Sequence, residues 1–423
     1  MDRRDFMKLA ALSGLAVVTP FAPELNAAEG SDGLYDTGNF FIAFVAAGGW
    51  DVTNLCDPKG NSSDVHQSFE ASAIKKAGNI SYAPLNNNEM FFNKYGSDIL
   101  AINGIDMIQA GHRACERYTW TGHLTSKMHP TFAAFYAAKK AEGRALPLGY
   151  LSYGSYSATG DLLPISRLRG TQALDKLINP KFYRANETLR FRSAFSEDAV
   201  QAALLERQAS RLAAKKLPKI KQAMGSMYSA QLSAAKLREL KAHLPEDLNS
   251  LTGLKKQVAV TLAACKAGIC ISANISQGGF DTHSDHETKQ NRRLTEYLDG
   301  VDYLLSQAET MGIRDRIVLM MSSEFSRTPK LNDGNGKDHW AVGSAMFMGP
   351  GIRGNRVIGA TDETHKAKGF DIDTMSPVED TIFRIRPQHI HKNLRKLTGI
   401  DDAPEAVNFK LVDEKDIDIN FFS

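Results

Sequence analysis

Long hydrophobic runs are absent from this chain, and this absence limits its relation to membranes. A membrane-spanning helix needs about 20 consecutive apolar residues, and the apolar stretch near the start, residues 9–18, is too short. The chain also lacks a dense basic tract interleaved with aromatic residues, and its formal net charge is only +3 over 423 residues. We therefore expect neither a stable membrane span nor nucleic acid as a partner.

Cysteine is scarce, with four residues in the whole chain: Cys56, Cys115, Cys265 and Cys270. No C-x-x-C spacing occurs, which argues against a metal cluster built from cysteine. An even number permits two disulfides in an oxidising compartment. Cys265 and Cys270 are the nearest pair, although the pattern places the first at a helix end and the second at a strand start. Buried free thiols are the alternative.

The first 28 residues have the organisation of an export signal. Arg3 and Arg4 precede the apolar stretch, and Pro20 and the small residues Ala27 and Ala28 follow it. This order predicts a cleavable twin-arginine signal, with the twin-arginine translocase as a partner and a periplasmic or secreted destination. An uncleaved amphipathic anchor is the alternative. Residues 29–423 are long enough for one large α/β domain with an insertion, or for two domains.

Five apolar runs predict the strands of a mainly parallel sheet. They lie at 39–47, 99–105, 269–276, 317–321 and 345–348, and several end in glycine. Continuous apolar runs of this length are typical of strands buried on both faces. A helix is predicted near Gly111, and another follows Asp281, where apolar residues recur on one helical face. The sequence thus predicts an α/β fold with helices on both faces of the sheet.

Residues 196–264 interrupt this alternation, because they are rich in Ala, Leu, Lys and Gln and contain no strand-like run. We expect two or three helices there, forming a helical insertion. The insertion is either a cap or partner surface, or a helical layer packed on the sheet. The pattern favours the helical layer.

Polar clusters follow the ends of the predicted strands, where ligands bind in open parallel sheets. Carboxylates and imidazoles that come together from separate strands suit a divalent ion, and this mixture favours zinc, manganese or iron over calcium. The clusters are Asp51; His112; Asp281 with His283 and His286; Glu324 with Arg327; and Asp338 with His339.

Five motifs in this order resemble the DUF1501 family. They are GGWDVTNLCDP (48–58), GHRACERYTWTG (111–122), GGFDTH (278–283), SSEFSRT (322–328) and GKDHW (336–340). The family is placed in the alkaline phosphatase and sulfatase superfamily, so the resemblance implies an alkaline phosphatase-like fold. It covers most of the chain and describes residues 196–264 least.

The resemblance also implies the site. Its expected metal ligands are Asp51, Asp281, His283, Glu324, Asp338 and His339, with His286 as a rival to His283. His112 and Arg327 are the expected catalytic residues. Arg327 would steady a substrate oxygen through its planar fork, and a structural ion pair is its alternative.

Gly111 departs from the family pattern, which commonly has serine before the histidine. The superfamily uses a hydroxyl nucleophile near this helix start, and glycine offers none. Water activated by the ion, the hydroxyl of Thr119 or Thr121, or loss of catalysis are the alternatives. The sequence therefore predicts an exported metal-dependent hydrolase of a phosphate or sulfate ester, or else a catalytically degenerate binding or assembly protein.

Overall fold

The computed structural model describes residues 38–60, 63–141, 146, 148–167, 203, 207, 240–379, 381–411 and 419–423. The predicted signal at 1–28 lies outside these residues, as does most of the predicted insertion at 196–264. In the described part of the chain, no helix has the length and apolar character needed to cross a bilayer.

A seven-stranded sheet forms the centre of the molecule, and it confirms the predicted α/β class. Every neighbouring pair is parallel except those made by β10, which runs antiparallel to both β7 and β4. In spatial order the strands are β11 (Arg356–Ile358), β4 (Leu100–Asp106), β10 (Val342–Met348), β7 (Ile317–Ser323), β1 (Phe40–Ala46), β6 (Ser272–Gln277) and β5 (Tyr150–Ser152).

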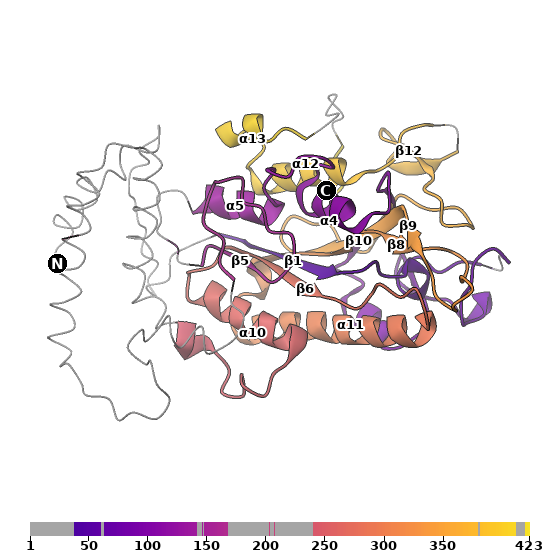
Figure 1. Ribbon diagram of the computed structural model, residues 1–423, viewed down its shortest axis with the longest axis horizontal. Coiled ribbons are helices and arrows are strands. Elements are labelled where there is room, and N and C mark those ends of the chain that lie inside the picture. The colour runs from indigo at the N-terminus through magenta and orange to yellow at the C-terminus, as the bar shows by residue number, and fades with distance from the viewer. Residues whose placement is uncertain are drawn as a thin grey trace.

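Helices cover both faces of the sheet, as the alternation of strands and helices predicted (Figure 1). One face carries α3 (Asn88–Tyr95), α10 (Gly253–Lys266) and α11 (His286–Thr310). The other carries α4 (His112–Thr121), α5 (Phe132–Lys140) and α12 (Pro387–Thr398). Helix α10 is the described end of the predicted insertion, and it packs on β6 and α11.

Short elements complete the described fold. Three two-stranded sheets pair β2 (Lys75–Ala77) with β3 (Ile80–Tyr82), β8 (Ser326–Arg327) with β9 (His339–Trp340), and β12 (Gly369–Asp371) with β13 (Ser376–Val378). The remaining helices are α13 (Pro404–Asn408) and the 3-10 turns η1 (Val52–Asn54), η2 (Ala71–Ala73) and η3 (Arg314–Arg316).

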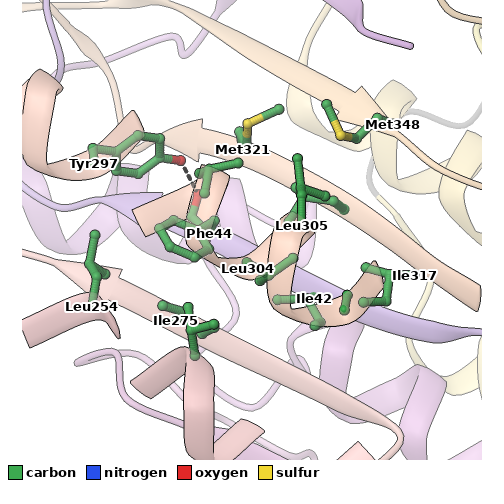
Figure 2. Packing of buried hydrophobic residues seen from close by; sticks show 14 of the residues in the cluster. Ile42, Phe44, Leu254, Ile275, Tyr297, Leu304, Leu305, Ile317, Met321 and Met348 are labelled. Carbon is green, nitrogen blue, oxygen red and sulfur yellow. Dashed lines mark hydrogen bonds between the residues drawn. The ribbon is translucent and has the colours of Figure 1, made fainter. Parts of the chain in front are cut away.

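Strand β1 shows why a continuous apolar run was needed. Successive side chains of a strand point to opposite faces, so Phe44 packs under α10 and α11, whereas Phe41 packs under α5. Figure 2 shows Phe44 beside Tyr297 of α11, whose hydroxyl donates a 2.6 Å hydrogen bond to the Phe44 carbonyl. Both faces of β1 are therefore closed to water.

The four cysteines are buried free thiols, which is the second of the two states considered from the sequence. Burial raises the pKa of Cys56 and of Cys115 to about 12. These two thiols are therefore protonated and poorly reactive at neutral pH.

Candidate metal centre

The loops at one end of the sheet bring the predicted clusters together. Asp281 follows β6, Glu324 follows β7, His112 begins the helix after β4, and His339 lies on β9 just before β10. Asp281 and Glu324 do not end neighbouring strands, because β1 lies between β6 and β7. The two carboxylates still converge, because His112 reaches Glu324 Oε1 at 2.7 Å and Asp281 Oδ2 at 3.4 Å.

Asp281 is the centre of the group, and three imidazoles turn their Nε2 atoms toward it. Its Oδ1 lies 3.0 Å from His283 Nε2 and 3.2 Å from His339 Nε2. These two Nε2 atoms are themselves 3.0 Å apart. Four ligand atoms around a tetrahedral zinc ion, each about 2.1 Å from it, are separated by about 3.4 Å. The spacing of these three atoms therefore fits one shared ion, and single ligand atoms of His112, Asp281 and His339 also lie within 4.8 Å of one another.

The outer nitrogen of each imidazole has an acceptor of its own. His112 Nδ1 is 2.7 Å from Glu324 Oε1, and His283 Nδ1 is 2.7 Å from Asp338 Oδ1. His339 Nδ1 is 2.8 Å from the Ala110 carbonyl. Carboxylates and carbonyls accept hydrogen bonds, so they hold the proton on Nδ1 and leave the Nε2 lone pairs facing Asp281. Metal-ligating histidines are oriented in this way.

The charge balance of the group favours a cation at its centre. Burial alone would raise the pKa of Asp281, but hydrogen bonding and charge from Arg327, with help from His339 and His112, lower it to about 2. Burial, together with the charges of Arg327 and His112, lowers the pKa of His339. At neutral pH the Asp281 carboxyl is therefore ionised, as a metal ligand must be.

Glu324 and Asp338, predicted as ligands, contact the outer nitrogens of the imidazoles in this structure. The Glu324 carboxyl is buried, which raises its pKa even though His112 and the Gly48 N–H donate to it. Asp338 is exposed, and its hydrogen bond from His283 lowers its pKa. His112, predicted as catalytic, presents its Nε2 to Asp281 beside His339. His112 is the first residue of α4, and the sequence pattern gave no sign that its ring would lie beside Asp281 and His339.

Asp51 lies outside the group of imidazoles. Its side chain is fully buried, and its Oδ2 contacts Lys337 Nζ at 2.7 Å and His286 Nε2 at 2.8 Å. His286, which was considered in place of His283, is therefore a hydrogen-bond partner of Asp51. Burial would raise the pKa of this carboxyl, but the Lys337 charge and the His286 hydrogen bond hold it well below its usual range.

The Arg327 side chain is fully buried, and its donors are directed at the chain itself. Nε donates to the Gly49 carbonyl at 3.1 Å, and Nη2 donates to the Gly48 carbonyl and to Asp281 Oδ1. Nη1 donates to the Lys337 carbonyl at 3.0 Å. This is the structural ion pair considered as the alternative. Arg327 thereby links Asp281 to the glycine turn after β1.

The hydroxyls proposed as replacement nucleophiles are also buried. Thr119 donates to the Ser323 carbonyl, and Thr121 donates to the Arg117 carbonyl within its own helix. Neither contacts the imidazoles among the described residues. Gly111 is the N-cap of α4, and no side chain caps the helix there.

The donor set fits zinc, manganese or iron. Imidazole nitrogens with one carboxylate are typical ligands of these ions, whereas calcium prefers an all-oxygen set. The side chains of His112, Asp281 and His283 are 40%, 44% and 47% exposed, so the centre is open to solvent.

Comparisons with known proteins place this chain by family. No curated protein matches it. Similar solved structures include the lipoteichoic acid synthase LtaP from Listeria monocytogenes, with 9% identity, 99% of this chain and 80% of that chain covered, and a TM-score of 0.38. The PsFucS1 sulfatase from Pseudoalteromonas sp. has 10% identity and a TM-score of 0.36. The match covers 96% of this chain and 74% of that chain.

The phosphonate monoester hydrolase of Agrobacterium radiobacter has 12% identity, covers 85% of this chain and 74% of its own, and has a TM-score of 0.32. Likeness at this level is too weak to bear on activity. The family model described as "Protein of unknown function (DUF1501)" matches residues 41–413, and this chain therefore belongs to the DUF1501 family.

Proposed function

We propose that this protein is an exported, metal-dependent hydrolase of a phosphate or sulfate ester. The observation that carries the proposal is the convergence of His283 Nε2, His339 Nε2 and Asp281 Oδ1 within 3.0–3.2 Å of one another. A divalent cation placed between these three atoms would be within reach of all of them. His112 Nε2, 3.4 Å from Asp281 Oδ2, completes the set.

The ion would be held by His112, Asp281, His283 and His339. A divalent ion bound there polarises an ester oxygen and lowers the pKa of water to near neutrality. Glu324, Asp338 and the Ala110 carbonyl keep the imidazoles in the ligating tautomer, and Arg327 keeps Asp281 ionised and oriented. Because the centre is exposed, an ester on a large or small molecule can reach it.

An anionic ester is the substrate class that fits the surroundings. Helix α4 begins at His112, and the free N–H groups and partial positive charge of a helix N-terminus favour anions. This feature and the family resemblance support phosphate or sulfate over a neutral ester. The hydroxyls of Thr119 and Thr121 donate to backbone carbonyls, so water is the proposed nucleophile.

A combined metal and turnover assay tests the function. We would measure bound metal by elemental analysis, and hydrolysis of aryl phosphate and aryl sulfate by the wild type and by His283→Ala, each with and without chelator. We expect turnover that is lost with chelator and lost in His283→Ala. Turnover that resists chelation would contradict the proposal.

Gly111→Ser is an informative companion variant. A Cβ at this position would meet only Gln109 Oε1, at 3.3 Å, so a serine fits with a small adjustment. If its hydroxyl reaches the ion, turnover rises and a covalent intermediate becomes trappable. A wild type that binds metal and hydrolyses no ester, even as Gly111→Ser, would favour the binding or assembly function.

Export is the part of the proposal that depends on residues 1–28. The arginine pair supports recognition by the twin-arginine translocase, which carries folded cargo. Arg3→Lys combined with Arg4→Lys should leave the protein in the cytoplasm, as measured by cell fractionation. An unchanged periplasmic yield would refute this route.

A further inference from the structure

A second carboxylate and imidazole lie buried beside the candidate metal centre, and their geometry repeats that of the ligand group. His286 Nε2 points at Asp51 Oδ2 at 2.8 Å, and His286 Nδ1 is 2.8 Å from Thr282 Oγ1. The Thr53 N–H donates to Asp51 Oδ1 at 2.9 Å. Asp51 and His286 thus form an oriented carboxylate–imidazole pair, as His283 and Asp281 do.

The difference between the two pairs is the cation. Lys337 Nζ lies 2.7 Å from Asp51 Oδ2 and 3.0 Å from the His66 carbonyl. The side chains of Lys337, Asp51 and His286 are all fully buried. The ammonium is a compact positive charge, and here it occupies the position that an ion would take between a carboxylate and a carbonyl oxygen.

The buried group is connected to the proposed metal centre through the chain. Lys337 directly precedes Asp338 and His339, and its carbonyl accepts from Arg327, which also binds Asp281. The buried ammonium and the proposed metal centre therefore belong to one assembly of loops.

We propose that Lys337 supplies an internal cation at Asp51, which limits the centre to a single divalent ion and closes a second site formed by Asp51, His286 and the His66 carbonyl. The inference rests on the proposed function for the first ion. Removing the ammonium leaves a buried carboxylate without its counter-charge, an arrangement that is strongly unfavourable. A divalent ion that enters the vacated space restores the charge balance.

The test compares the zinc content of the wild type with that of three variants. Lys337→Ala opens the second position. Asp51→Asn with Lys337→Ala opens the same space without the charge. Lys330→Ala removes an exposed lysine of the same loop region, which pairs with exposed Asp64, and is the matched surface control. Zinc per chain is measured by elemental analysis after gel filtration, and the melting temperature is measured with increasing zinc.

We expect a single zinc ion in the wild type, in Lys330→Ala and in the double variant, and a second ion in Lys337→Ala. The melting temperature of Lys337→Ala should be low without zinc and should rise more with zinc than that of the double variant. If Lys337→Ala does not fold without zinc, its recovery when expressed with added zinc, compared with the double variant, gives the same answer.

The outcomes separate the two proposals. A second ion in the wild type, or no additional ion and no additional zinc stabilisation in Lys337→Ala, overturns the role of Lys337 while leaving the first site intact. Absence of zinc from the wild type refutes the metal-dependent function itself.

Discussion

At the scale of single residues, the outer nitrogens of the imidazoles decide which side chains are ligands. A carboxylate beside a histidine can bind the ion or orient the ring. In this protein Glu324 and Asp338 lie against Nδ1 atoms, 2.7 Å away, whereas Asp281 lies against Nε2 atoms. The structure therefore separates these three predicted acidic ligands into Asp281 at the centre and two residues that contact the outer nitrogens of the rings.

Glu324→Gln tests this separation, because a glutamine carbonyl still accepts from His112 Nδ1. Loss of an orienting partner lowers metal affinity by about 10–100-fold, so we expect a change at the lower end of that range. His283→Ala, which removes a ligand, should cost more. Zinc affinity is measured by competition with a chelator, and the ligand set is monitored by the visible spectrum of the cobalt-substituted protein. A spectrum altered by Glu324→Gln would make Glu324 a ligand.

At the scale of elements, the glycine turn after β1 allows the loops to approach one another. Gly48 has a φ of +119°, and a Cβ there would lie 2.4 Å from the Asp281 backbone nitrogen. The Gly48 N–H donates to Glu324, and its carbonyl accepts from Arg327. A single glycine thus lets three strand ends meet at the site, since only glycine readily adopts this backbone conformation without clash.

Gly48→Ala should therefore destabilise the protein by about 2 kcal/mol or more and weaken zinc binding, because Asp281 is displaced. Gly278→Ala is the matched control from the second glycine pair, where nothing lies within 4 Å of the added Cβ. The free energy of unfolding in urea and the zinc affinity of both variants check this. Equal effects of the two substitutions would contradict the close-approach explanation.

At the scale of the whole molecule, two buried histidines outside the site make the fold sensitive to acid. Burial lowers the pKa of His391 to about 3 and that of His129 to about 4, from an ordinary value of 6.5. His391 Nε2 lies 2.7 Å from the Thr119 carbonyl, and His129 Nε2 lies 3.0 Å from the Phe409 carbonyl. Both rings are neutral in the folded protein and become charged in the unfolded chain below pH 6.5.

Their contribution to stability is complete above pH 6.5 and is lost as the pH falls toward 4 and 3, because the unfolded state then binds more protons. At pH 5 each group removes about 2 kcal/mol from the free energy of unfolding. His391→Gln keeps a donor for Thr119 and cannot titrate. It should reduce the fall in stability between pH 7 and pH 5 by about 2 kcal/mol, as measured by urea unfolding. An unchanged pH dependence would rule out His391 as its source.

Local patterns in the sequence were sufficient for the elements and for the end of the sheet that carries the site. Apolar runs predicted β1, β4, β6, β7 and β10, because a strand buried on both faces requires a continuous apolar sequence. The start of α4 was also predicted. The rule that ligands bind at the carboxyl ends of strands brought Asp281, Glu324 and His112 to one place.

Only the tertiary structure decided where each side chain points. Spacing could not distinguish His283 from His286, because the choice depends on Asp51 and Asp281, which lie on different loops. The Arg327 side chain points inward, where it donates hydrogen bonds to the carbonyls of Gly48, Gly49 and Lys337. The Asp51 carboxylate forms a buried ion pair with Lys337, which is 286 residues away in sequence. A buried charge must find its counter-charge in space, and sequence spacing does not contain that information.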